Sequence, residues 1–162
     1  MNDALRIGLG IDVHRLEPGR RCVLGGIPFD GAPVGPIGHS DGDAVLHAAC
    51  DAVLGAAGLD DLGTLFSDQD PQHRDRDSAD FCRQTRRLVH ERGLRVLSLD
   101  VVVETEVPRL APHRAAMRER IAGLFELPPD RVNLKGKTGE KVDAIGRGEA
   151  LRATVVALLG PR

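Results

Sequence analysis

Alternating apolar and polar positions predict a strand near the start of the chain. In residues 5–15, LRIGLGIDVHR, apolar side chains recur at every second position, which is the period of a half-buried strand. A turn at residues 17–19, Glu-Pro-Gly, then allows residues 21–26, RCVLGG, to return as the second strand of a hairpin. Residues 30–38 are rich in Gly and Pro and predict a loop. The chain is therefore expected to open with a β-hairpin.

A strongly apolar stretch predicts a buried helix from about residue 41 to residue 57. Ser40, with Asp43 three residues later, has the spacing of a weak capping box at its start. Small or apolar residues fill almost every other position, but Asp43, His47 and Asp51 lie on one face at intervals of four. A solvated stripe fits poorly with such an apolar helix, and a buried charge must be paired or bind a metal. We therefore expect this face to look onto a metal, with the two carboxylates orienting the imidazole.

Helices and strands alternate through the rest of the chain. Residues 59–77 are mostly polar and predict a long loop, a feature that is often functional. The pattern beyond this loop predicts a helix from Ser78 to about Arg92 with Gly93 as its cap, a strand at 95–105, a helix at 112–125, a strand at 131–137, and a C-terminal helix at 146–159 with Leu151, Val155, Leu158 and Leu159 on one side. This alternation predicts a single sheet with helices packed mainly on one face.

Composition and charge narrow the class of protein. The chain has 162 residues, 41% of them hydrophobic, and a net charge of −2, which suits one globular domain and does not imply broad nucleic-acid binding. The chain has three cysteines, Cys22, Cys50 and Cys82, and no C-x-x-C pair. This favours a reducing compartment and argues against a zinc site made of thiolates. No apolar run is long enough to span a membrane, and the N-terminal stretch lacks the features of a signal peptide. We expect a cytoplasmic protein that binds neither membrane nor nucleic acid.

Asp12, His14 and His47 form a candidate metal site. Asp12 and His14 lie two residues apart on the first predicted strand and therefore project from the same face. One carboxylate and two imidazoles suit zinc, and three protein ligands leave a fourth position open for chemistry. The spacing alone would also fit a strand-edge Asp and a core His satisfied by hydrogen bonds. The polar stripe on the apolar helix favours the metal.

The segment 135–141, KGKTGEK, is a second candidate site. It contains all three lysines of the chain, together with Thr138 and Glu140. As a functional site it would handle phosphate, with lysines and backbone N–H groups meeting anionic oxygens and Glu140 holding a hard cation such as magnesium. A solvated turn after a strand is the simpler interpretation of the segment alone. Further along the chain, Arg147 and Glu149 could form a surface ion pair of little energetic value.

Five stretches of the sequence occur in the order and spacing of a known family. They are GIDVHR, LGG, GHSDGDAVLHAACDAVLGAAG, DLGTLFSDQDP and GRGEA, and with them the chain resembles the 2-C-methyl-D-erythritol 2,4-cyclodiphosphate synthases of the non-mevalonate isoprenoid pathway, over about residues 5–160. The resemblance implies a single domain over residues 1–162, in which residues 1–4 are disordered or an extension. It also implies an α/β (α+β) fold, a four-stranded mixed sheet with helices packed on one face, and a homotrimer with active sites between subunits.

The resemblance further implies a reaction and its cofactors. The family converts 4-diphosphocytidyl-2-C-methyl-D-erythritol 2-phosphate to 2-C-methyl-D-erythritol 2,4-cyclodiphosphate and releases CMP, so the chain would be a lyase. An isoprenoid diphosphate in a cavity on the trimer axis near Arg147 is a further partner that the resemblance leaves open. The implied catalytic and metal-binding residues are Asp12, His14 and His47 for zinc, Glu140 for magnesium or manganese, and Thr138.

The substrate contacts are also implied by the resemblance. The start of the long helix would bind the 2-phosphate, the loop after that helix would lie near the methylerythritol, and segments 105–111 and 136–138 would hold the cytidine and its phosphates. Ser67 stands where the family often has Pro, and Arg109 stands where Lys is common. The implied contacts are His39 and Ser40, then Asp61, Gly63, Phe66, Asp68 and Asp70, then Arg109, Lys137, Thr138 and Arg147.

Two other classes of function remain open from the residues. A metal-dependent phosphohydrolase would use the same open zinc position to activate water, and its product would be a linear phosphate. A metal-stabilised nucleotide-binding module would need a closed metal site, and the sequence offers no fourth protein ligand with suitable spacing. The product of the reaction distinguishes these classes from a cyclase.

Overall fold

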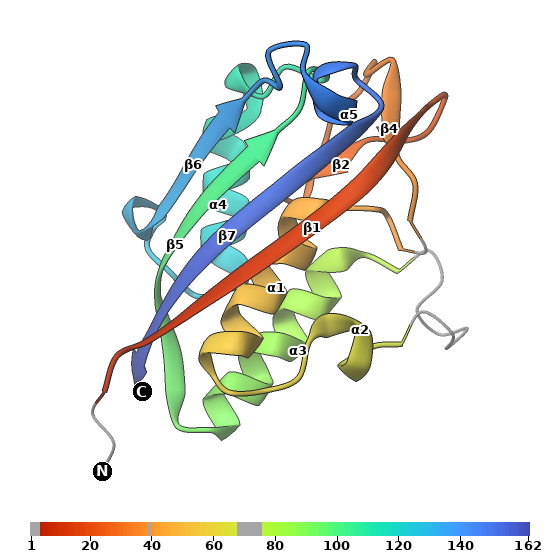
Figure 1. Cartoon of the computed structure of the whole chain (residues 1–162). Coiled ribbons are helices and arrows are strands. Elements are labelled where there is room, and N and C mark those ends of the chain that lie inside the picture. Colours follow the sequence, from red (N-terminus) through yellow and green to blue (C-terminus); the bar gives the residue numbers. More distant parts are fainter. Residues whose placement is uncertain (1–3, 39, 68–75) are drawn as a thin grey trace.

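The computed structural model describes residues 4–38, 40–67 and 76–162, and within them five strands form a twisted mixed sheet (Figure 1). The β5–β6 pair is parallel, and the other neighbouring pairs are antiparallel. The α/β class and the mixed sheet are therefore as the sequence predicts, with five strands in place of four. In spatial order the strands are β4 (Val34–Pro36), β1 (Arg6–Pro18), β7 (Ala150–Pro161), β5 (Leu94–Glu104) and β6 (Val132–Lys137).

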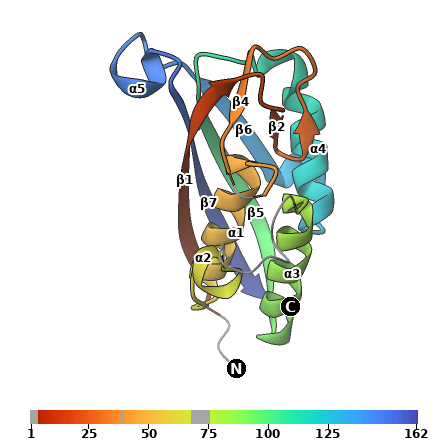
Figure 2. The ribbon, with the colours of Figure 1, turned by 90° about the vertical axis from the view of Figure 1, so that its right-hand side faces the viewer.

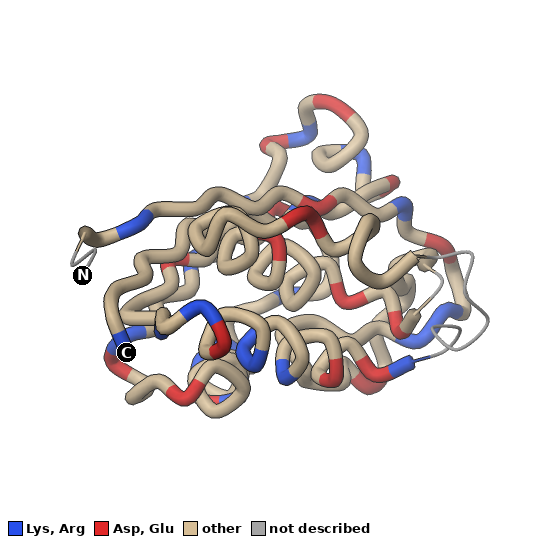
Figure 3. Tube along the Cα trace, turned by 90° about the horizontal axis from the view of Figure 1, so that it is seen from below, with Lys and Arg blue, Asp and Glu red and all other residues tan. Residues whose placement is uncertain are grey.

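Long helices cover one face of this sheet (Figure 2). Helix α1 packs across β1 and β7, and α3 and α4 lie beside it on the same side. Charged residues of both signs are interspersed along the trace (Figure 3). Within the described residues, no helix is both long and apolar enough to cross a membrane. The helices are α1 (Ala44–Ala56), α2 (Leu62–Leu65), α3 (Ser78–Glu91), α4 (Arg114–Leu124) and α5 (Asp143–Gly146), with 3-10 turns at Ala111–His113 and Pro129–Arg131.

The C-terminal element is a strand, so the predicted helix at 146–159 is wrong. Strand β7 lies at the centre of the sheet, between β1 and β5. Every second residue of β7 is fully buried, namely Leu151, Ala153, Val155, Ala157 and Leu159. This period of two is that of a strand, and β-branched residues such as Val155 and Val156 pack well on a pleated surface. The leucines and Val155 also happen to fit a helical stripe, which is the source of the error. The elements predicted at 78–92, 95–105, 112–125 and 131–137 are confirmed as α3, β5, α4 and β6.

The hairpin expected at the start of the chain does not form. Strand β1 pairs with β7 from Arg6, opposite Leu159, to Arg15, opposite Ala150, and pairs with β4 at its far end. The segment expected to return beside β1 instead contributes β2 (Val23–Leu24), which pairs with β3 (Ile27–Pro28) in a separate two-stranded sheet. Because β7 is nearly as long as β1, it forms main-chain hydrogen bonds along most of one edge of β1. A short local strand could not do this.

The inner face of β1 touches α1 through two glycines. A Cβ atom added to Gly8 would lie 1.9 Å from the carbonyl oxygen of Ala52, and one added to Gly10 would lie 2.0 Å from the carbonyl oxygen of Ala48. Any side chain at either position would therefore overlap the helix backbone. The two glycines allow strand and helix to pack backbone against backbone.

The outer face of β1 carries a row of exposed apolar side chains. Alternation along the strand places them opposite the glycines, on the side of the sheet away from α1. Their exposed fractions run from 53% at Ile11 to 73% at Ile7, and Val156 on the neighbouring β7 adds to the row at 42%. A contiguous apolar surface of this kind is typical of a protein–protein contact. The row consists of Leu5, Ile7, Leu9, Ile11 and Val13.

Candidate metal centre and the cavities beside it

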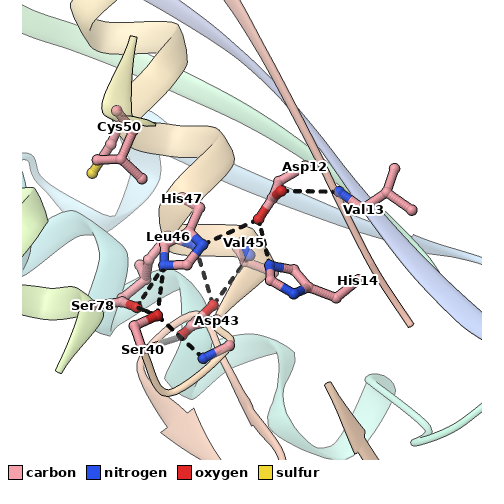
Figure 4. Close-up of polar contacts among 12 residues, drawn as sticks. Asp12, Val13, His14, Ser40, Asp43, Val45, Leu46, His47, Cys50 and Ser78 are labelled. Atoms are coloured by element: carbon pink, nitrogen blue, oxygen red, sulfur yellow. Dashed lines mark hydrogen bonds and ion pairs between the residues drawn. The ribbon is translucent and has the colours of Figure 1, made fainter. Parts of the chain in front are cut away.

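Asp12, His14 and His47 converge at one point between β1 and α1 (Figure 4). Asp12 and His14 continue the inner face of β1 beyond Gly10, and the close packing of strand and helix brings His47 within reach of them. Asp12 Oδ2 lies 2.8 Å from His14 Nε2 and 3.1 Å from His47 Nδ1. One ligand atom from each residue lies within 4.8 Å of the others. The structure thus brings together the three residues that the sequence selects.

The hydrogen bonds of His14 indicate that a positive charge belongs between it and Asp12. His14 Nδ1 lies 2.5 Å from the carbonyl oxygen of Ile37, which can only accept, so Nδ1 carries a proton. In a neutral imidazole Nε2 then points a lone pair at Asp12 Oδ2, and two half-buried acceptors in contact require a proton or a cation between them. A carboxylate with two imidazole nitrogens is a donor set that suits zinc. These residues therefore fit a divalent metal with one coordination position free.

The electrostatics of the cluster follow from the same contacts. Burial alone would raise the pKa of Asp12, but hydrogen bonds and charge interactions with His14 and His47 lower this pKa to about 2. Burial alone would lower the pKa of His14, but the Asp12 carboxylate and the Ile37 carbonyl outweigh it and raise that pKa above 6.5. Asp12 is therefore ionised at neutral pH, as a metal ligand must be, and its carboxylate favours the protonated form of His14 when no metal is bound.

A cavity of about 610 Å³ opens beside the cluster. Its wall includes Asp12, His14 and His47 themselves, and also three of the predicted substrate contacts. Arg20 and Phe81, which the sequence did not single out, line it as well. The cavity is therefore large enough for a small organic phosphate and places it against the cluster. The predicted substrate contacts in its wall are Ser40, Gly63 and Phe66.

Asp43 is the N-cap of α1, a place that the sequence assigns to Ser40. Its Oδ1 accepts hydrogen bonds from two N–H groups in the first turn of α1, both at 3.1 Å. The carboxylate also accepts from the N–H groups of Gly25 and Gly26, at 2.8 and 2.6 Å. Burial raises the pKa of Asp43 to about 6 against the effect of these bonds. The contacts fix the start of α1, and so the place of His47 one turn later.

Asp51 accepts a hydrogen bond from α2 and none from the imidazole of His47. Its Oδ1 accepts the N–H of Leu62 at 2.7 Å, which holds the first residue of α2 beside α1. The expectation that Asp43 and Asp51 orient His47 is therefore wrong, because both carboxylates are engaged with backbone N–H groups. The side-chain partners of the imidazole are Asp12, Ser40 and Ser78. The contacts of Ser78 with His47 and with Asp41 were missed by sequence reasoning, since they join residues 31 and 37 positions apart without any local pattern.

A second cavity of about 220 Å³ lies at the ends of β5 and β6. Both segments expected to hold a nucleotide, 105–111 and 136–138, contribute to its wall. They include Arg109, Lys137 and Thr138, which are predicted substrate contacts. The structure thus gathers this group of residues into one pocket, lined by different residues from the larger cavity.

Glu140 lies next to this second pocket in sequence and contacts Thr138. The Thr138 hydroxyl donates to Glu140 Oε1 at 3.4 Å. Over the described ranges, the one group of three metal-binding side chains is Asp12, His14 and His47, and Glu140 is not part of it. Within a single chain Glu140 therefore offers one carboxylate, and a cation there would need further ligands from a substrate or a second subunit.

The remaining predicted site residues lie apart from both cavities or outside the described residues. Arg147 and Glu149 form an exposed two-point ion pair, with Nε–Oε1 at 3.0 Å and Nη2–Oε2 at 3.2 Å, so they are a surface pair in this chain. Asp61 caps α2 by accepting the N–H of Thr64 at 2.8 Å. Three predicted contacts, and part of the predicted N-terminal extension, lie outside the described residues: His39, Asp68, Asp70 and residues 1–3.

The fold and the site together define a class, namely an α/β protein whose helix-covered sheet carries a potential metal-binding triad. Comparison with known proteins then identifies the family. The model of the YgbB family matches residues 5–160, so the chain belongs to the YgbB family.

Individual relatives agree with this family. A 2-C-methyl-D-erythritol 2,4-cyclodiphosphate synthase from Xanthomonas oryzae pv. oryzae is 46% identical over 160 residues, which cover 99% of this chain and 98% of the relative. A solved synthase of this name in a CDP-bound form is 44% identical, with a TM-score of 0.88, and the match covers 95% of this chain and 99% of that one. The CDP complex of IspF from Plasmodium falciparum is 31% identical, with a TM-score of 0.86 and coverage of 99% and 98%. The resemblance noted from the sequence is thereby confirmed.

Proposed function

We propose that the chain cyclises 4-diphosphocytidyl-2-C-methyl-D-erythritol 2-phosphate at the Asp12–His14–His47 centre, giving 2-C-methyl-D-erythritol 2,4-cyclodiphosphate and CMP. As a member of its family the chain is a phosphorus–oxygen lyase of the non-mevalonate isoprenoid pathway. The observation that carries the assignment to this centre is the convergence of three metal-binding atoms beside a cavity of substrate size. The cytoplasmic location expected from the sequence stays a prediction.

The reaction forms one P–O bond and breaks another. An oxygen of the 2-phosphate attacks the β-phosphorus, and the bond from that phosphorus to the bridging oxygen of CMP breaks. The attacking oxygen is already anionic at neutral pH, so the reaction requires no strong general base. The obstacle is repulsion between two anionic groups. Asp12, His14 and His47 would hold zinc, and Glu140 would hold magnesium or manganese. As Lewis acids, the two cations would offset the negative charge of the phosphates.

The residues around the large cavity would hold the reacting end of the substrate. Ser40 Oγ accepts the N–H of Gly42 at 3.3 Å and lies 3.1 Å from His47 Nε2, so its own proton can be donated to an oxygen of the 2-phosphate. Gly63 and Phe66 would pack against the methylerythritol. Holding both ends of the reacting chain in place can supply about 7–11 kcal/mol of the barrier. The predicted contacts of His39, Asp61, Asp68 and Asp70 belong to the same proposal.

The cytidine diphosphate end would occupy the smaller pocket. Two solved relatives are CDP complexes, and this supports a cytidine diphosphate ligand for the pocket that Arg109, Lys137 and Thr138 line. The guanidinium of Arg109 and the ammonium of Lys137 would offset the charge of the phosphates, and the hydroxyl of Thr138 would donate to one of the phosphate oxygens.

A homotrimer would bring the two pockets together. In one chain the pockets are lined by different residues, and Glu140 is not among the metal ligands that cluster at β1 and α1. The exposed apolar row on β1 supports an interface between copies, because such a surface is costly to leave in water. We therefore assign the active site to the boundary between neighbouring subunits of a trimer.

We also propose that an isoprenoid diphosphate binds on the trimer axis. A cavity of about 580 Å³ on this chain is lined by Val13 from the apolar row and by Gly148–Ala150 next to Arg147. The apolar side would suit an isoprenoid tail, and the exposed Arg147 guanidinium would suit its diphosphate.

Phosphorus NMR of the purified protein with substrate, zinc and magnesium tests the proposed function. We expect the signals of a cyclic diphosphate and of CMP. A linear phosphate product would identify a phosphohydrolase, and a substrate that binds without turnover would identify a nucleotide-binding module. Either result would overturn the proposal.

A further inference from the structure

A chain of hydrogen bonds joins the start of α3 to His47. The Ser78 hydroxyl donates to Asp41 Oδ1 at 2.5 Å, and the Ser78 N–H donates to Asp41 Oδ2 at 3.1 Å. On its other side Ser78 Oγ lies 2.9 Å from His47 Nε2. Ser78 is fully buried, so these bonds are protected from exchange with water. Figure 4 shows Ser78 and Ser40 on the Nε2 side of the ring and Asp12 on the other side.

The direction of each bond follows from the number of protons. The Asp41 carboxylate faces three donors, the hydroxyl and N–H of Ser78 and the N–H of Asp43, so it acts as an acceptor throughout. A hydroxyl has one proton, and Ser78 gives it to Asp41. Ser78 Oγ must therefore accept at its contact with His47, and the imidazole must donate from Nε2–H.

A proton on Nε2 leaves the lone pair of a neutral His47 on Nδ1. This is the nitrogen that lies 3.1 Å from Asp12 Oδ2, on the metal side of the ring. Ser40 Oγ lies 3.1 Å from the same Nε2 and shares the proton, with Ser78 as the nearer acceptor. The bonds thus determine which nitrogen of His47 is free to bind a metal.

In His14, too, a hydrogen bond to one ring nitrogen leaves the other nitrogen free to bind a metal, but the acceptor is of a different kind. Its outer nitrogen donates to the backbone carbonyl of Ile37, a group that no side-chain substitution removes. The tautomer of His47 depends instead on two side chains, Asp41 and Ser78, which come from the loop before α1 and from the first turn of α3. His47 is therefore the ligand whose orientation is open to mutation at a distance.

We propose that Asp41 and Ser78 are positioning residues that hold His47 in the Nε2–H tautomer and so present Nδ1 to the metal. The inference rests on the proposed function of the Asp12–His14–His47 centre. Groups that orient a metal-binding histidine from behind typically change metal affinity or activity by 10–100-fold when they are removed. A wrong tautomer can also abolish the role of a histidine while its geometry stays intact.

Proton–nitrogen correlation NMR of the imidazoles in the metal-free parent protein provides the first test. We expect His47 to carry a proton on Nε2, whether or not a second proton lies between Nδ1 and Asp12. In Asp41→Asn the Ser78 proton is released and can turn towards His47, so the population with the proton on Nδ1 should rise. A parent protein in which His47 has no proton on Nε2 would overturn the inference without recourse to any variant.

Zinc competition against a coloured chelator provides the second test. We expect Ser78→Ala and Asp41→Asn to weaken zinc binding by about 10–100-fold, and to shift the visible absorption bands of the cobalt-substituted protein. Thr85→Val is the matched control, because Thr85 is a buried hydroxyl on the same helix without a hydrogen-bond partner among the described residues. If Ser78→Ala had the same zinc affinity and the same cobalt spectrum as Thr85→Val, the inference would be overturned.

The two proposals fail in different ways. Both tests use metal-free protein, zinc alone or cobalt alone, so they stay decisive if the parent protein does not turn over the substrate. In that case the proposed function fails, but the tautomer of His47 and the affinity for zinc still decide the role of Asp41 and Ser78.

Discussion

Gly10 and Ala48 are in backbone contact, so strand β1 lies directly on helix α1. A Cβ on Gly10 would be 2.0 Å from the Ala48 carbonyl oxygen and 2.7 Å from the backbone nitrogen of Ala52. Asp12 follows Gly10 on the same face of the strand, and His47 precedes Ala48 on the helix. The distance between these two metal ligands is therefore set by a glycine that has no chemistry of its own.

Gly10→Ala should destabilise the protein and weaken its metal site together. The added methyl group forces the strand away from the helix, and overpacking of this kind costs roughly 1–3 kcal/mol or more in the free energy of unfolding. Zinc affinity should fall as well, because Asp12 moves away from His47. Urea unfolding and zinc competition measure the two effects. Gly55→Ala, on the open side of α1 with nothing within 4 Å, is the control and should raise stability by about 0.4–1 kcal/mol. A Gly10→Ala variant as stable as the parent would contradict the close packing.

His47→Ala should lose zinc and nearly all turnover while the fold is kept. The side chain contributes a metal-binding nitrogen, and even groups that only support such a ligand change affinity or activity 10–100-fold, so we expect a loss of at least about 100-fold. Metal analysis, circular dichroism and the phosphorus NMR assay measure content, fold and turnover. His90→Ala, on α3 and outside the cavity wall, should leave all three unchanged. Turnover at the parent rate in His47→Ala would remove zinc from the mechanism.

Glu140→Gln should leave zinc in place and change the dependence on magnesium. Glu140 is outside the three-residue cluster, so its charge is not needed for zinc. As the proposed ligand of the second cation, its loss should raise the magnesium concentration for half-maximal rate by at least about tenfold. Glu91→Gln neutralises another exposed carboxylate, at the end of α3, and serves as the control. An unchanged magnesium titration in Glu140→Gln would exclude the residue from this role.

The raised pKa of His14 makes zinc compete with a proton. Burial lowers this pKa, but Asp12 and the Ile37 carbonyl raise it above 6.5 overall. A protonated His14 therefore stabilises the metal-free protein fully below pH 6.5, and this contribution is lost as the pH rises through the folded-state pKa. Zinc needs the neutral imidazole, so its affinity increases over the same range. The increase in Tm caused by zinc should therefore grow with pH, measured by thermal unfolding with and without the metal. A constant increase between about pH 6 and 8 would contradict this linkage.

Ile7→Glu should convert the proposed trimer into monomers. Ile7 is 73% exposed in the single chain and lies in the apolar row of β1, where a buried unpaired charge would be strongly unfavourable in an interface. Light scattering after gel filtration measures the mass directly, and turnover should fall with the loss of the shared site. Leu65→Glu, which adds the same charge at a residue 37% exposed on α2, should leave the mass unchanged. A monomeric parent protein would disprove the trimer.

The sequence predicts the site better than the sheet. The D-x-H pair on a strand and the histidine in an apolar helix could be found because strand and helix periods decide which side chains share a face. The pairing of β1 with β7 could not, since no local pattern chooses between a near partner and a distant one. Leu151 and Val155 illustrate the same limit, because four-residue spacing satisfies a helix as well as a strand. The contact of Ser78 with His47 depends on how α3 docks on α1, which is a property of the packed core.

The central place of β7 delays the completion of the molecule. Gly10 pairs with Val155, so the first strand in chain order finds its main partner in the last one. Contacts between such distant segments slow folding. On the ribosome β1 would emerge early and wait, with its unpaired edge and its apolar outer face uncovered, until β7 has been synthesised. Nascent chains of this protein should therefore depend on chaperones until β7 emerges.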